Sequence, residues 1–398
     1  MKFKSMLHSS ILVSVLLVGA CGMRDISNQN TQRSSISSVS IPQTAVRNQM
    51  NIGFCWAYSG IGLLESKLKT GMGMQFDFSE EALGFYRIIE ELSFYTKAYQ
   101  ADPQTTFAEL TAAVQKSTLQ GWIVKRDPAD KSFQMRDTLE LIEFYGVIPE
   151  SAWNIKFSSP VKTERMTAAV KSAYLKLLQL KGRSGTITTD DYLNILAQPN
   201  AFGSIPPNQF NFNGQIITAQ AFVRDVANFR ASDFVSLDAK TSRDVPKIVS
   251  ALKQTLARGI SVPIGFGVNF SMLNKGTFTF PNRSDSEYDN IPEKESLKAF
   301  AKDGGHAVLV TDFVNKGGRE GAIPAAELQV ELAKSSEELS YVKVKNSWGL
   351  KAASNEGGVS IGGASDGYFR LELGYMKGSA DAAFLTIVVP ANIAAAIK

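Results

Sequence analysis

The stretch that decides the fold is "NQMNIGFCWAYSG", residues 48–60 of the 398-residue chain. It contains Cys55, one of only two cysteines, with a tryptophan directly after it and Gln49 six positions before it. Downstream of Cys55, apolar residues recur at helical spacing, while Glu65 and Lys67 fall on other faces. The pattern predicts a helix that begins near Cys55. The thiol would then lie at a helix N-terminus, where the helix dipole stabilises a thiolate.

The composition is that of a soluble globular protein and argues against a nucleic-acid partner. Hydrophobic residues make up 44% of the chain and charged residues 20%, which are ordinary values. The formal net charge is +4. Without Lys2 and Lys4, which lie in the N-terminal segment described next, 40 basic and 38 acidic residues remain, a net charge of +2. Such a small excess does not indicate nucleic-acid binding.

The N-terminus has the pattern of an export signal. The basic stretch "MKFK" precedes the apolar run "ILVSVLLVGA", which is short for a membrane span. Residues 1–20 are therefore predicted to be a signal peptide, and residues 21–40, rich in Ser, Asn and Gln, a flexible tether. The small residues before Cys21 resemble a bacterial lipobox. This implies an acylated Cys21 and a lipid anchor in a bacterial membrane, in the periplasm or at the cell surface. The alternative is an ordinary signal peptide and a secreted protein.

This reading leaves few residues for metal or disulfide chemistry. If Cys21 is acylated, Cys55 is the only free thiol and no intramolecular disulfide can form. His8 lies in the predicted signal peptide, so His306 is the only histidine of the mature chain. A zinc site built from several His and Cys residues is excluded. We expect neither a metal nor a cofactor.

The chain divides into a helical half and a β half. We expect a helical lobe with the nucleophile over residues 41–155, a mainly helical insertion over 156–245, and a β lobe with the histidine over 246–398. The predicted helices are 55–69, a helix starting within 76–83 with Ser79 as N-cap, 137–145, 163–181 and 246–257. The predicted strands are 260–268, 306–313, 341–348, 367–373 and 383–389.

Four further residues supply what a catalytic thiol needs. His306 opens an apolar strand and is the only imidazole available to activate Cys55. In "KNSWG", the side chain of Asn346 can accept the imidazole N–H, and Trp348 can shield that hydrogen bond from water. Gln49 and the backbone N–H of Cys55 can form an oxyanion hole. Each residue alone is usually structural, but together they fit one geometry.

The three segments that carry these residues resemble the active-site segments of papain-like cysteine peptidases, in the same order. They are "VRNQMNIGFCWAYSG", "GGHAVLVTDF" and "YVKVKNSWG". The resemblance implies an α+β, two-lobe fold with a helical N-terminal lobe, an antiparallel β-barrel-like C-terminal lobe and a largely helical insertion. It also implies catalysis by Cys55, His306, Asn346 and Gln49, shielding by Trp348, and peptide or protein substrates.

The middle of the chain resembles the bleomycin hydrolase and aminopeptidase C branch of that family. His306 lies 251 positions after Cys55 (306 minus 55), whereas the papain pattern needs about 130–150. "FQMRDTLELIEFYGVIPESAWN" is one of the stretches that carry the resemblance. In that branch the C-terminal tail lies in the cleft and makes the enzyme an aminopeptidase. Here the tail "VVPANIAAAIK" either enters the cleft or finishes a strand and frays.

Two residues depart from the branch. Phe54 stands where an arginine usually precedes the cysteine, and Gly305 precedes His306. Phe54 is therefore our candidate for a residue that influences substrate choice. The prediction is a cysteine peptidase that uses a thiolate–imidazolium pair, with aminopeptidase action and oligomeric state left open. The alternatives are a catalytically silent binding or scaffold lipoprotein on the same fold, which the two departures would suit, and an acyl transferase with the same residues.

Overall fold

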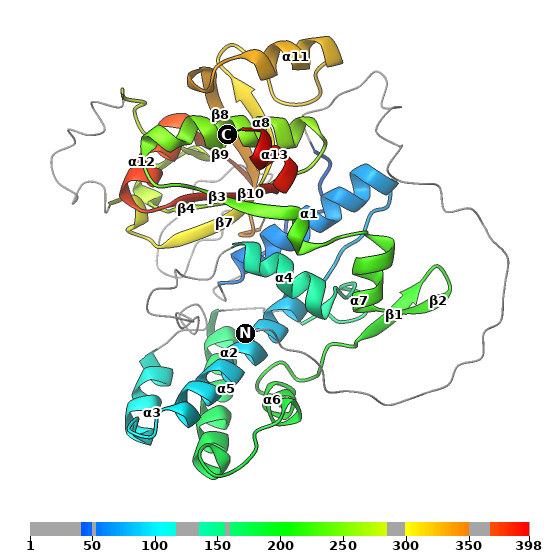
Figure 1. Ribbon diagram of the computed structural model, residues 1–398, viewed down its shortest axis with the longest axis vertical. Helices are drawn as coiled ribbons and strands as arrows, with labels where there is room; N and C mark the ends of the chain where they lie inside the picture. Colours follow the sequence, from blue (N-terminus) through cyan, green and yellow to red (C-terminus); the bar gives the residue numbers. More distant parts are fainter. Residues whose placement is uncertain are drawn as a thin grey trace.

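The computed structural model describes residues 41–49, 53–116, 135–155, 160–284, 299–349 and 367–397. These residues form a lobe built around a sheet and a lobe built mainly of helices, with α1 at their boundary (Figure 1). The helices are α1 (Cys55–Met72), α2 (Glu80–Ala101), α3 (Phe107–Lys116), α4 (Met135–Tyr145), α5 (Pro160–Lys181), α6 (Thr189–Leu196), α7 (Ala219–Ala221), α8 (Val245–Ala257), α11 (Ala325–Ala333), α12 (Leu373–Ala382) and α13 (Ala391–Ala396). The strands are β1 (Gln209–Phe212), β2 (Gln215–Thr218), β3 (Phe234–Ala239), β4 (Val262–Gly267), β5 (Leu273–Asn274), β6 (Thr277–Phe278), β7 (Gly305–Asn315), β8 (Leu339–Lys345), β9 (Tyr368–Glu372) and β10 (Leu385–Pro390).

The helix α1 begins at the predicted cysteine and lies between the two lobes. It packs against α2 and α4 on one side and against β7 on the other. Its C-terminus is set by Gly73, which adopts φ +67°, a left-handed conformation that glycine enters without steric cost. Its N-cap residue, Phe54, makes no side-chain capping hydrogen bond. The backbone N–H groups of the first turn are therefore not engaged by a capping side chain.

The sheet of the β lobe has eight strands in the order β3-β10-β4-β7-β8-β9-β6-β5. Neighbouring strands are antiparallel except for β6 and β9, which are parallel. The predicted α+β class is confirmed, but the sheet is open, with β3 and β5 at its edges, and does not close into a barrel. The helix α8, predicted from its apolar spacing, packs against β10 and β3.

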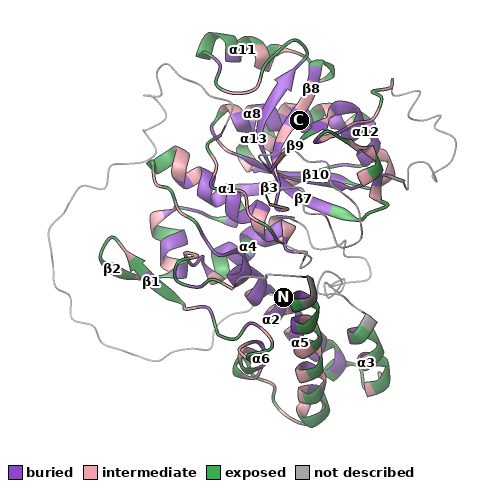
Figure 2. Ribbon diagram, turned by 180° about the vertical axis from the view of Figure 1, so that it is seen from behind, coloured by how far each residue is buried: buried purple, intermediate pink, exposed green. Residues whose placement is uncertain are grey.

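The segment 156–245, expected to be a mainly helical insertion, is of mixed structure. It contains α5 and α6, but also the hairpin β1–β2 and the edge strand β3. Its apolar side chains do not form a core of their own. They share one buried cluster with α1, α2 and α4, whereas the β lobe has a second cluster. Figure 2 shows burial concentrated in the sheet and around α1, with more exposed residues on α3, α5 and α6.

The C-terminal tail adopts neither of the two expected conformations. After β10 it forms the short helix α13, which packs against α8, β3 and β10. The alanine-rich sequence favours a helix, and Ile393, fully buried, anchors it to the β lobe. Figure 1 places the C-terminus beside α8. The part of the tail that the structure describes is therefore ordered on the β lobe.

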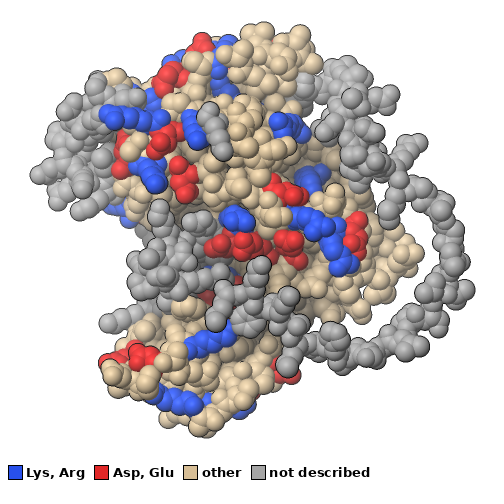
Figure 3. Space-filling model, viewed as in Figure 1, with Lys and Arg blue, Asp and Glu red and all other residues tan. Residues whose placement is uncertain are grey.

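Two further expectations concern the membrane. The predicted signal peptide, Cys21, His8 and the tether lie outside the described residues. Within the described ranges, no helix combines the length and the apolar character that a membrane crossing requires. On the face drawn in Figure 3, basic and acidic side chains are interspersed rather than segregated by sign.

Candidate active site

The structure brings His306, Asn346 and Trp348 together at the end of the sheet. His306 lies near the start of β7, and its Nε2 is 2.7 Å from Oδ1 of Asn346, just beyond β8. Because an amide oxygen only accepts, this geometry places a proton on Nε2 and leaves Nδ1 free to take up another. The Trp348 ring stacks on the imidazole, with centroids 4.2 Å apart and planes 13° apart. His306 and Asn346 are both buried, so this hydrogen bond is sheltered from water.

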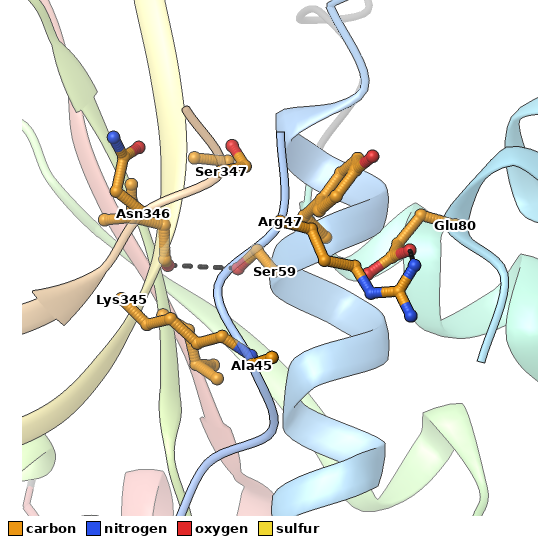
Figure 4. Close-up of a pocket in the computed structure, with 11 residues that line it drawn as sticks. Ala45, Arg47, Ser59, Glu80, Lys345, Asn346 and Ser347 are labelled. Carbon is orange, nitrogen blue, oxygen red and sulfur yellow. Dashed lines mark hydrogen bonds and ion pairs between the residues drawn. The ribbon is translucent and has the colours of Figure 1, made fainter. Parts of the chain in front are cut away.

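Cys55 joins this group from the first turn of α1. Its side chain is a free thiol of intermediate exposure, and it interacts with the backbone N–H of Ala307, the residue after His306. One turn further along α1, Ser59 donates a hydrogen bond of 3.0 Å to the carbonyl of Val308 (Figure 4). This contact fixes α1 against β7. The first turn of α1 therefore lies against the part of β7 that carries His306, although the two segments are far apart in the sequence.

Burial controls the protonation of both groups. It raises the pKa of the Cys55 thiol, and the backbone N–H groups of Ala307, Trp56 and Cys55 itself act in the opposite direction. Burial also lowers the pKa of His306 from 6.5 to about 4, against the effect of its hydrogen bond to Asn346. Each charge alone is thus unfavourable at this site. A thiolate–imidazolium pair at this site would have to recover that cost through the attraction between its two charges.

Gln49 is held next to the same loop by a short ladder of hydrogen bonds. Its backbone N–H donates to Ser347 O (2.8 Å), and Gly349 N–H donates to Arg47 O (2.9 Å). The hydroxyl of Ser347 donates to Oε1 of Gln49 over 2.5 Å. This bond engages the oxygen end of the amide and orients its NH₂ group, the end that an oxyanion hole requires. Residues 50–52, between Gln49 and α1, lie outside the described ranges.

Comparisons with known proteins identify the fold. No family model matches the chain, and no curated protein matches its sequence. Among solved structures, PepW from Lactobacillus rhamnosis has a TM-score of 0.54 at 16% identity, over 90% of this chain and 83% of that one. The protein has a papain-like fold.

Two other solved structures are similar at a lower level. The bromelain protease from Ananas comosus, in complex with the inhibitor E64, is 14% identical with a TM-score of 0.36, over 89% of this chain and 98% of that one. A structure from work on the mite allergens Blo t 1 and Der p 1 is 13% identical with a TM-score of 0.36, over 87% and 67%.

A chain of buried polar groups behind Asn346 was not predicted from the sequence. Lys345 Nζ donates to Thr44 Oγ1 (2.8 Å), which in turn donates to Glu65 Oε2 (2.5 Å), so that β8 is linked to α1. We expected Glu65 to lie away from the apolar face of its helix, but its residue exposure is only 3%. Burial raises the pKa of Glu65 and lowers that of Lys345. A glutamate between core leucines was the sequence signal for this arrangement.

A second group of charged residues, of which Glu80 is buried, extends from the same pocket into the helical lobe. Arg47 lies 3.9 Å from Glu80 and forms ion pairs with Asp77 and Glu150. Figure 4 shows Arg47 directed toward Glu80, with Lys345 on the opposite side of the pocket. Burial, followed by the charge of Glu81, raises the pKa of Glu80 well above its usual range. These residues contact the predicted catalytic segments and hold them in place.

Phe54, the residue before the predicted nucleophile, packs inside the helical lobe. Its side chain is 3% exposed and packs in the helical-lobe core, edge-on to Trp56. A Cβ placed on Gly84 of α2 would lie 2.1 Å from the Phe54 ring, so the glycine makes room for the phenylalanine. Phe54 is therefore a packing residue, and its influence on substrate choice stays a prediction.

The described residues contain no group of three or more His, Cys, Asp and Glu side chains that could hold a metal ion.

Proposed function

We propose that the protein is a cysteine peptidase that hydrolyses peptide bonds with Cys55 as nucleophile. The observation that carries the proposal is the position of His306, which is hydrogen-bonded to Asn346 and stacked on Trp348. The Cys55 thiol lies beside the backbone N–H of the following residue, Ala307. Nucleophilic catalysis needs a thiol and an oriented imidazole close together, and here the helix-terminal thiol contacts the backbone of the residue that follows His306. The papain-like fold supports this proposal.

The proposed reaction follows from these positions. As Sγ of Cys55 attacks the peptide carbonyl, its proton passes to Nδ1 of His306. The developing oxyanion is stabilised by the Gln49 amide and the Cys55 N–H. The imidazolium then protonates the leaving amine, which departs and leaves a thioester. His306 next takes a proton from water, whose oxygen attacks the thioester and releases the acid and the thiol. Asn346 keeps the imidazole in one orientation throughout.

Two variants test the proposal. The Cys55→Ala protein should lose peptide cleavage and labelling by an epoxysuccinyl thiol-protease inhibitor. The matched control is Cys21→Ser, which removes the only other cysteine of the chain and should retain both properties. Cleavage that persists in the Cys55→Ala protein would contradict the proposed mechanism. Folded wild-type protein that neither cleaves peptides nor takes up the label at Cys55 would instead support a catalytically silent binding protein.

We further propose cleavage within peptides rather than stepwise trimming from the N-terminus. The support is α13, which holds the C-terminal residues against α8 and β3 on the β lobe. A tail bound there does not supply the block that would restrict the site to N-terminal residues. Mass-spectrometric mapping of a peptide-library digest tests this. Internal cuts are expected, and products shortened one residue at a time from the N-terminus would contradict it.

Export and lipid anchoring are proposed on the sequence alone. The signal-like N-terminus and Cys21 support a protein attached to a bacterial membrane by an acylated cysteine. Radiolabelled palmitate supplied to cells that express the full chain should be incorporated into the wild-type protein. It should not be incorporated into Cys21→Ser, which should move to the soluble fraction. Equal labelling of the two proteins would argue against the anchor.

A further inference from the structure

The β lobe contains a cavity of about 420 Å³ at the end of the sheet opposite His306. Its walls come from the segment after β6, from the residue after β7, from the start of β8 and from the junction of β9 and α12. Cavities that bind small molecules measure about 300–1,000 Å³. The volume therefore suits a ligand at the small end of that range.

The cavity is separate from the candidate active site. Strand β7 carries His306 near its start and is followed by Lys316, which lines the cavity. Strand β8 begins in the cavity wall at Leu339 and is followed by Asn346 at its other end. Because a strand rises about 3.3 Å per residue, Lys316 lies roughly 30 Å from His306. A ligand in the cavity would thus leave the candidate active site open.

The aromatic wall of the cavity is fixed by packing. The ring of Phe280 lies edge-on to Phe300, with centroids 4.8 Å apart, and the Arg283 guanidinium lies 5.2 Å from the Phe280 centroid. A Cβ placed on Gly374, in the first turn of α12, would clash with the carbonyl oxygen of Phe280. The two chain segments are therefore in direct contact. The cavity is pre-formed, as sites for small molecules usually are.

The cavity has apolar walls as well. Leu339 and Leu373 line it and are almost fully buried, and the half-buried Phe280 adds an aromatic surface. Apolar side chains of a ligand would lose contact with water against these three residues. A ligand with an apolar body fits this lining better than a purely polar one.

Two opposite charges line the same cavity. The Lys316 side chain is exposed, and Glu372, the N-cap residue of α12, is half-buried and makes no capping hydrogen bond. Among the residues that the structure describes, neither side chain forms an ion pair, and the two do not pair with each other. Burial raises the pKa of Glu372, the direction expected where no cation compensates for lost hydration. Both charges are available to a ligand.

We propose that this cavity binds a small apolar zwitterion, that is, a free amino acid or a dipeptide with large apolar side chains. The ligand carboxylate binds Lys316, its ammonium group binds Glu372, and its side chains lie against Phe280 and Leu373. The inference does not depend on the proposed function, since binding in the cavity requires no reaction at Cys55.

Calorimetric titration of the Cys55→Ala protein tests the inference. The probes are phenylalanine and the dipeptide Leu-Phe, each compared with its N-acetylated and its C-amidated form. At least one of the two zwitterions should bind, and blocking either terminus should weaken its binding about 10-fold, the scale of a hydrogen bond to a charged group. Binding of phenylalanine alone would identify an amino-acid site, and binding of Leu-Phe alone a dipeptide site.

Two variants assign the charges. Glu372→Gln should weaken binding of the zwitterion about 10-fold and leave the N-acetylated probe unaffected, because that probe has no ammonium group. Lys316→Met should do the same for the carboxylate, with the C-amidated probe unaffected. The matched control is Lys247→Met, which removes an exposed lysine from α8 and should leave every affinity unchanged.

The titration needs no cleavage, so its result is independent of the proposed function. If neither zwitterion binds, or if Glu372→Gln and Lys316→Met both leave the affinity unchanged, the inference is overturned. Wild-type protein that binds the zwitterion but cleaves no peptide would contradict only the proposed function.

Discussion

The two lobes contribute different kinds of residue to opposite sides of the candidate site. The helical lobe contributes the buried carboxyl groups of Glu65 and Glu80, the partly exposed Arg47 beside Glu80, and the packed ring of Phe54. The β lobe contributes glycines on β4 and β7 and the half-exposed ring of Phe384. The difference indicates a division of labour. The helical side contains buried carboxyl groups and a packed aromatic ring, whereas the sheet side has glycines and one half-exposed ring.

The largest expected effect is that of His306→Ala, which removes the imidazole that the β lobe contributes to the proposed site. In His306→Ala, burial still raises the pKa of Cys55, and only backbone N–H groups oppose it. The thiol should therefore stay protonated at neutral pH. Peptide cleavage should fall by about 10³-fold or more, and iodoacetamide should modify Cys55 much more slowly. Trp348→Phe, which keeps an aromatic face over the imidazole, should lose far less activity. Near-normal rates in His306→Ala would contradict the proposed pair.

The second prediction concerns stability and the helical side. Phe54→Ala removes a ring that is 3% exposed in the helical-lobe core, so we expect a loss of about 3–5 kcal/mol in the free energy of unfolding. Urea denaturation followed by circular dichroism measures it. The complementary change Gly84→Ala forces a methyl group into the same ring and should also destabilise, by about 1–3 kcal/mol. If neither variant lowered the unfolding free energy, Phe54 would not be a stabilising packing residue and would not differ from Phe384 in this respect.

The third prediction concerns the polar link between the lobes. Lys345→Met removes the donor to Thr44 and leaves Glu65 buried without a nearby cation in this chain of hydrogen bonds. We expect a loss of about 1–3 kcal/mol in unfolding free energy, and lower activity because Asn346 is the next residue. The double variant Lys345→Met/Glu65→Gln should recover part of the loss, since the residues are coupled. If the losses of the two single variants simply add up in the double variant, Lys345 and Glu65 are not energetically coupled.

The fourth prediction uses pH to compare the lobes. Burial raises the pKa of Glu91 in α2 from 4.5 to about 8, and that of Asp312 in β7 from 3.8 to about 6. A folded-state pKa above the unfolded value stabilises the fold at low pH, and this contribution is lost as pH rises through the folded pKa. Stability should therefore fall between about pH 4.5 and 8 because of Glu91, and between about pH 3.8 and 6 because of Asp312.

Two conservative variants separate these windows. Glu91→Gln should flatten the fall in unfolding free energy above pH 6 by more than about 1 kcal/mol, and Asp312→Asn should affect only the acidic side. Urea denaturation across the pH range gives both curves. If Glu91→Gln leaves the unfolding free energy above pH 6 unchanged, Glu91 of the helical lobe is not the cause of the fall in stability over that pH range.

The smallest expected effect is that of Phe384→Ala on stability. Because the ring is 40% exposed and lies over glycines, its removal should cost less than about 1 kcal/mol. The same denaturation assay applies, with Phe54→Ala as the comparison. A loss as large as that of Phe54→Ala would make Phe384 a packing residue like Phe54.

Local patterns predicted most of the regular structure. The helices α1, α4, α5 and α8 and the strands β4, β7, β8, β9 and β10 lie within a few residues of the predicted ranges, because apolar spacing and stop signals are local. Ser79 caps α2 as expected, accepting a hydrogen bond from Ala82 N–H. The predicted catalytic residues were found by motif, and the structure brings His306 together with Asn346 and Trp348 and Gln49 together with Ser347. Their roles in catalysis stay predictions.

What the sequence did not reveal depends on tertiary context. The helices α11 and α12 were not predicted, and β3 was hidden in a segment read as helical. The burial of Glu65 follows from Thr44 and Lys345, which reach it from distant parts of the chain. The direction of Phe54 follows from the space above Gly84. Such partners lie tens to hundreds of positions away, so no local periodicity reports them.

The contact between Ser59 and Val308 also bears on how the protein is made. The two residues are 249 positions apart, and the bond from Ser347 to Gln49 spans 298. Contacts of such long range close late, because chain entropy must be lost before they form. A chain emerging from a ribosome or threading through a translocation pore carries Cys55 without its imidazole partner, or the reverse. The proposed catalytic set is therefore complete only when the β lobe has folded onto α1, which would keep the thiol inert until synthesis and transport are finished.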